Sequence, residues 1–173
     1  MLRFCLMLFA LLLIIVAWFI VTTTGQLADP VATHFGSGYL ANGWMTRDGY
    51  LAFSLAFSVF LPVVIAGLVV WLPRVASGPL SLPNRDYWLA PERRAATLES
   101  ITVRAIAIGS LFAIFMAGVH WLILEANAAV PPQLPARLFW AMLIAFLAAL
   151  TVWIGTFWSK FHNVAGRSVT RDH

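Results

Sequence analysis

The sequence predicts an all-α membrane protein with four transmembrane helices, both termini cytoplasmic, and one structured extracytoplasmic loop between helices 1 and 2. Of its 173 residues, 61% are hydrophobic and only 10% are charged, whereas soluble domains carry roughly 25% charged residues. Four long apolar runs follow one another along the chain, and basic residues flank them. Few residues lie outside these runs, so we expect a single transmembrane domain over residues 1–173.

The first two spans are predicted at residues 4–22 and 50–72. The first run follows Arg3 and exceeds the roughly 7–15 apolar residues of a signal peptide. Because no convincing Ala-x-Ala cleavage site follows it, we expect a retained helix. The second run has no charge and is long enough to cross a hydrocarbon core of about 30 Å. Pro62 and Gly67 lie inside it and are candidates for a bend.

The third and fourth spans are predicted at residues 105–124 and 138–158. His120 is the single ionisable residue of the third span, which the prolines after Val130 bring to an end. A helix is predicted to begin at Pro91, since proline fits the first helical position, and it can continue unbroken into the third span.

The basic residues predict the orientation. Placing both termini in the cytoplasm leaves residues 23–49 as an outer loop and residues 73–104 as an inner loop. The inner segments, including the tail after residue 158, then hold nine of the 11 Lys and Arg residues, and the outer segments hold only Arg47 and Arg137. Cytoplasmic segments carry this excess of positive charge. We therefore expect a multi-pass protein of the bacterial inner (cytoplasmic) membrane.

Composition and motifs also narrow the function. With Cys5 as the single cysteine, no intrachain disulfide and no cysteine-based metal cluster can form. The basic residues flank spans rather than forming a patch, so we expect the lipid bilayer and no nucleic acid among its partners. No nucleophile triad, paired carboxylates, phosphate loop or haem motif occurs. We therefore expect a protein that is not an enzyme.

The outer loop holds the candidate binding residues, and they share polar or aromatic character between turn-forming residues. They are His34, Phe35, Asn42, Trp44 and Arg47. His34 has two interpretations. It either hydrogen-bonds within the loop and fixes its shape, or it contacts a partner or a metal, since imidazole titrates near neutrality.

His120 is the second candidate, because an ionisable side chain inside a span usually faces the protein interior. One interpretation is a neutral hydrogen-bonding partner between helices. The other is a polar or metal site on the outer side, formed by His34, His120 and Glu125 or Asn127. Two histidines and a carboxylate suit zinc or copper. No cofactor is required by any motif, so such a metal is the less favoured interpretation.

The inner loop is rich in arginine. Arg85, Arg93 and Arg94 are candidates for binding lipid phosphate or for docking a partner on the inner face.

Two segments resemble a known family. The outer motif runs from Pro30 through His34-Phe35 and Gly38 to Asn42-Gly43-Trp44 and Arg47, and the inner one spans residues 82–94. Together they resemble a small bacterial membrane domain of unknown function, which also occurs at the N-terminus of immunity proteins against the sporulation-delaying toxin. The resemblance implies an accessory subunit of a membrane complex, or an envelope-stress or immunity-type factor.

Two functions from different classes therefore remain. The first is a binding or accessory protein that contacts a protein partner or a second copy of itself. The second is a metal-binding or small-solute transport component that uses His34 and His120.

Overall fold

The computed structural model describes residues 1–75 and 82–162. Within this part of the chain, four helical segments are long and apolar enough to cross a membrane: Leu2–Thr24, Arg47–Pro73, Pro91–Ala128 and Ala136–His162. They confirm the four predicted spans and extend each of them at both ends. Residues 76–81 of the predicted inner loop and the basic tail after His162 lie outside the described residues.

The second span is not a uniform helix. It consists of α2 (Arg47–Leu55), the π-helical turn η1 (Ala56–Phe60) and α3 (Leu61–Val75). Pro62 explains the turn, because proline has no N–H to donate and its ring crowds the carbonyl of the residue four positions earlier, which is Ser58. A π-helical turn is one way for a helix to accommodate this conflict. The irregularity therefore lies on the N-terminal side of Pro62.

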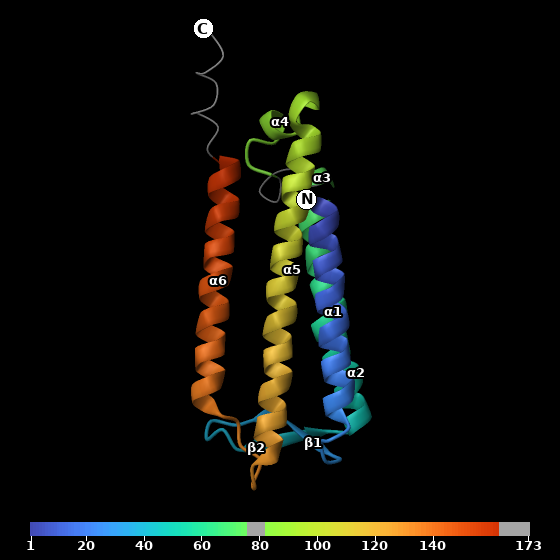
Figure 1. Ribbon diagram of the computed structural model, residues 1–173. Helices are drawn as coiled ribbons and strands as arrows, with labels where there is room; N and C mark the ends of the chain where they lie inside the picture. Colours follow the sequence, from blue (N-terminus) through green and yellow to red (C-terminus); the bar gives the residue numbers. More distant parts are fainter. Residues whose placement is uncertain (76–81, 163–173) are drawn as a thin grey trace.

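The third span lies at the centre of the bundle. Helix α5 (Pro91–Ala128) has 38 residues, or about 57 Å at 1.5 Å per residue. It begins at the predicted Pro91 and contacts the first helix, α1 (Leu2–Thr24), as well as α3 and the last helix, α6 (Ala136–His162) (Figure 1). Since a hydrocarbon core is about 30 Å thick, α5 is long enough to extend beyond it.

The loop between the first two spans contains a feature that the all-α prediction missed. Strands β1 (Val31–Phe35) and β2 (Ala41–Met45) pair antiparallel across one end of the bundle (Figure 1). The pairing is irregular, since the register shifts on both sides of His34. The alternation of apolar and polar residues is too short here to distinguish a strand from a loop. The fold is therefore the predicted four-helix arrangement, in which the predicted structured loop forms a β-hairpin.

A short helix, α4 (Arg85–Trp88), lies at the opposite end of the bundle, where α1 begins and α6 ends (Figure 1). It contacts the end of α6. Trp88 Nε1 donates to the carbonyl of Phe161 at 2.9 Å. Asn84 Nδ2 donates to the carbonyls of Phe161 and His162 at 3.1 and 2.8 Å. The last carbonyls of a helix have no partner within the helix, so this segment satisfies the end of α6.

Candidate functional site

The hairpin motif is built around His34. Its Nδ1 lies 2.6 Å from Asn42 Oδ1 on the facing strand, and an amide oxygen can only accept, so Nδ1 carries the proton. His34 pairs with Gly43, where an added Cβ would lie 2.9 Å from the Cβ of His34. An added Cβ at Gly36 would meet Asn42 at 3.0 Å. The glycines thus leave room for the histidine and the asparagine, and His34 helps to fix the shape of the loop.

Asn127 attaches the hairpin to α5. Its Oδ1 accepts from the Ala32 N–H, and its Nδ2 donates to the Ala32 carbonyl, both at 2.9 Å. The side-chain amide therefore takes the place of a neighbouring strand on the open edge of β1. Because Asn127 also donates to the Ile123 carbonyl at 2.9 Å, its own orientation is fixed.

The turn of the hairpin is attached to the segment between α5 and α6. The Ala41 N–H donates to the Pro132 carbonyl at 3.0 Å, and the Leu134 N–H donates to the Tyr39 carbonyl at 2.8 Å. Trp140 Nε1 donates to the Tyr39 hydroxyl at 3.1 Å. The hairpin is thereby joined to the third and the fourth spans.

The remaining predicted binding residues have different environments. Phe35 packs against the buried cluster that includes Val31 and Tyr50. Arg47 turns back on the loop, where its N–H donates to Asp29 Oδ1 at 3.2 Å and its guanidinium donates to the Leu27 carbonyl at 3.4 Å. Trp44 is 53% exposed. Among the five predicted residues, Trp44 is therefore the large side chain that the hairpin presents outward.

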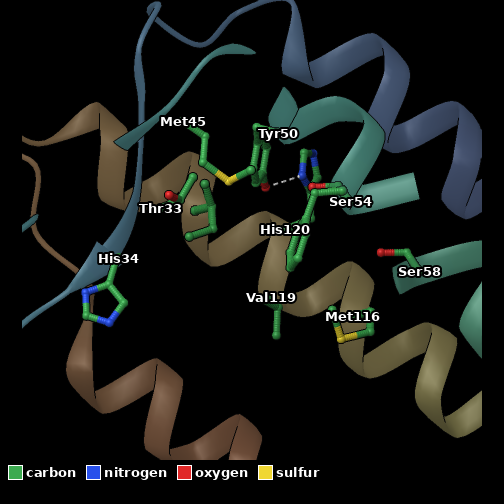
Figure 2. Close-up of a pocket in the computed structure, with 11 residues that line it drawn as sticks. Thr33, His34, Met45, Tyr50, Ser54, Ser58, Met116, Val119 and His120 are labelled. Atoms are coloured by element: carbon green, nitrogen blue, oxygen red, sulfur yellow. Dashed lines mark hydrogen bonds between the residues drawn. The ribbon is translucent and has the colours of Figure 1, made fainter. Parts of the chain in front are cut away.

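Beneath the hairpin, His120 joins three helices. Its side chain is 2% exposed, and its Nδ1 lies 2.7 Å from the Tyr50 hydroxyl on α2 (Figure 2). Its Nε2 lies 2.8 Å from Thr23 Oγ1 on α1. The Thr23 hydroxyl donates its proton to the Phe19 carbonyl at 2.6 Å, so it accepts from His120. The hydrogen bonds run in one direction, from Tyr50 through a neutral His120 to Thr23 and Phe19.

This geometry matches the first of the two interpretations of His120, a neutral partner between helices. The metal interpretation required three side chains to converge. In residues 1–75 and 82–162 no group of three or more His, Cys, Asp or Glu residues could hold a metal ion. His34 lies on the hairpin away from His120 (Figure 2), and Glu125 is exposed. The structure does not bring the predicted metal ligands together.

The predicted inner-face arginines lie at the other end of the bundle. Arg93 stacks over the ring of Tyr87, with its guanidinium carbon 4.1 Å from the ring centroid. Arg85 and Arg94 line a shallow depression together with Asp86. Two of the three are thus brought together, beside a carboxylate.

The sequence analysis missed three polar residues near the hairpin and His120: Thr23, Tyr50 and Ser58. A signal for two of them exists, since Tyr50, Ser54 and Ser58 recur every four residues in an otherwise apolar span and so share one helical face. Comparison of the chain with models of protein families, with curated proteins and with solved structures found no match.

Proposed function

We propose that this protein is a non-enzymatic, multi-pass protein of the bacterial inner membrane that acts by binding a protein partner through its extracytoplasmic hairpin. Its termini then lie in the cytoplasm. Such a role suits an accessory subunit of a membrane complex, or an envelope-stress or immunity-type factor.

The observation that carries this proposal is the exposed Trp44 on a hairpin that is hydrogen-bonded to the bundle at both its edge strand and its turn. Exposed aromatic side chains dominate binding energy at protein interfaces. A site that is already rigid loses less conformational freedom when it binds. The arrangement therefore favours recognition of a partner over a purely structural role.

Site-specific photocrosslinking tests the proposal. A photoreactive phenylalanine derivative replaces Trp44 in living cells, and in a matched strain it replaces Trp158, which is 57% exposed at the opposite end. We expect a discrete protein adduct from position 44 that is absent from position 158. The adduct should disappear when Gly43→Val is added, because a side chain there collides with His34.

Two results would contradict the proposal. Position 44 could yield lipid adducts alone, which would make Trp44 an interfacial anchor of the kind common at membrane surfaces. Equal adducts from the two positions, or an adduct that persists in the Gly43→Val variant, would show that the hairpin has no part in recognition.

A further inference from the structure

A pocket lies beneath the hairpin, between the second and the third spans. Its volume is about 250 Å³, whereas a single water needs only roughly 10–15 Å³ of such space. The lining residues come from the hairpin, from α2 and η1, and from α5 (Figure 2). The pocket is therefore large enough for an organic molecule, and three elements that are far apart in the sequence form its walls.

The pocket extends inward from the hairpin along the helices. His34 lies at its hairpin end, and Tyr50, Ser54 and Ser58 follow one another along its wall (Figure 2). Ser58 lies eight positions after Tyr50, which is about 12 Å at 1.5 Å per residue. The pocket thus reaches from the end of the bundle well into the second span.

Ser58 is the lining residue whose burial needs an explanation. Its side chain is 1% exposed, and its hydroxyl has no hydrogen-bond partner within residues 1–75 and 82–162. Figure 2 shows the hydroxyl directed toward the other pocket residues. Buried polar side chains nearly always have a partner, so a group from outside the chain would complete this one. The π-helical turn before Pro62 holds Ser58 in this position.

The other lining residues restrict which kind of ligand could supply the hydrogen-bond partner of Ser58. Phe53, Met116 and Val119 provide apolar surface, and among the described residues no Asp, Glu, Lys or Arg lines the pocket. An uncompensated charge would be strongly disfavoured in such surroundings. The ring nitrogens of His120 already bond Tyr50 and Thr23, and the Ser58 hydroxyl is the buried polar atom of the described lining residues that still needs a partner. A neutral ligand with an apolar body and one hydrogen-bonding oxygen fits these walls.

We propose that this pocket binds a neutral, mostly apolar molecule that places a hydroxyl or carbonyl oxygen against the Ser58 hydroxyl. This site is separate from the surface of Trp44, and its existence does not depend on a protein partner. Membrane lipids and lipid-soluble metabolites share this chemistry. The test therefore uses two simple probes that differ only in one hydroxyl group.

The experiment uses the purified full-length protein and two photoreactive probes of equal length. One probe is a diazirine derivative of 1-octanol, and the other is the matching diazirine octane. We expect the alcohol probe to label residues within 50–58 or 116–123, and excess 1-octanol to compete with it. Ser58→Ala should weaken binding of the alcohol about five- to tenfold, the effect of one net hydrogen bond, and should leave binding of the alkane unchanged.

Val119→Phe fills the pocket and should abolish labelling by both probes. Its matched control is Val152→Phe on α6, where the valine is 65% exposed, and labelling should not change. Ser110→Ala, in α5 outside the pocket lining, serves as the control for Ser58→Ala. Melting curves without probe check the fold, and Ser58→Ala should melt no lower than the native protein, since its hydroxyl has no partner to lose.

The proposal is overturned if the alcohol fails to label the pocket, if it binds the Ser58→Ala variant as well as the native protein, or if Val119→Phe leaves labelling intact. A lower melting temperature for Ser58→Ala would show that the hydroxyl has a partner within the protein, which would also overturn it. The crosslinks from position 44 are independent of all these results.

Discussion

At the scale of single residues, His120 shows how a polar side chain is accommodated inside a membrane span. An ionisable group among apolar helices is costly unless its hydrogen-bonding atoms are satisfied. Tyr50 provides the donor and Thr23 the acceptor, so the neutral ring links α1, α2 and α5. The Phe19 ring also packs against it in a T-shaped arrangement, with ring centroids 5.2 Å apart. These contacts make His120 a structural connection between helices.

Replacing Tyr50 with phenylalanine tests this connection. Tyr50→Phe removes the donor and leaves His120 Nδ1 buried without a partner, so we expect a loss of about 1–2 kcal/mol in the free energy of unfolding. Unfolding in detergent, followed by circular dichroism, measures it. Tyr39→Phe is the matched control, because its hydroxyl bonds Trp140 at an exposed site, and it should cost much less. Equal losses for the two variants would contradict the role given to His120.

The sequence could predict that His120 lies within the third span and faces the protein interior, but not which residues it bonds. Thr23 and Tyr50 are 97 and 70 residues away, and no local pattern encodes such distant pairs. The same reasoning applies to Asn127. Its place on the helical face of His120 is visible in the sequence, whereas its bonds to Ala32 depend on how the hairpin folds over the end of α5.

At the scale of elements, close packing around Gly109 holds the central helices together. An added Cβ on Gly109 would lie 3.0 Å from Phe9 Cζ and from the Pro62 carbonyl oxygen, and 3.3 Å from Ala66 Cβ. The glycine therefore lies where α1, α3 and α5 meet. Small residues at such positions allow helix backbones to approach one another closely in membranes.

Two glycine substitutions should have opposite effects on stability. Gly109→Ala forces a methyl group against a backbone carbonyl, and we expect it to destabilise the protein by about 1–3 kcal/mol. At Gly155 on α6, an added Cβ meets nothing within 4 Å, so Gly155→Ala should stabilise the helix by up to about 1 kcal/mol. Thermal unfolding in detergent compares them. Stabilisation by both changes would show that the helices are not packed tightly at Gly109.

The elements themselves differed in how well the sequence predicted them. All four spans were predicted, because long uncharged apolar runs leave few alternatives to a membrane helix. The hairpin was predicted only as a structured loop, since its strands have five residues each and are rich in small and polar residues. Pro62 and Gly67 were predicted only as candidates for a bend, and the π-helical turn at Ala56–Phe60 was not predicted. The burial of Ser58 also depends on the packing of α5 against this turn.

At the scale of the whole molecule, α6 is joined to the rest of the bundle near both of its ends and along α5. Asn84 and Trp88 bond its last carbonyls, and Trp140 near its start bonds Tyr39 of the hairpin. Between these ends, Trp153 Nε1 donates to the Arg104 carbonyl at 3.0 Å. The hairpin and the segment around α4 therefore lie at opposite ends of one connected structure.

The account depends most directly on which side of the membrane the hairpin faces. In a Cys5→Ala background, Gly38→Cys places a thiol in the hairpin turn, where an added Cβ meets nothing within 4 Å, and Ser159→Cys places one near the end of α6. Intact cells with a permeable outer membrane are treated with a membrane-impermeant maleimide. The account predicts labelling at position 38 but at position 159 only after lysis, and the reverse pattern would contradict it.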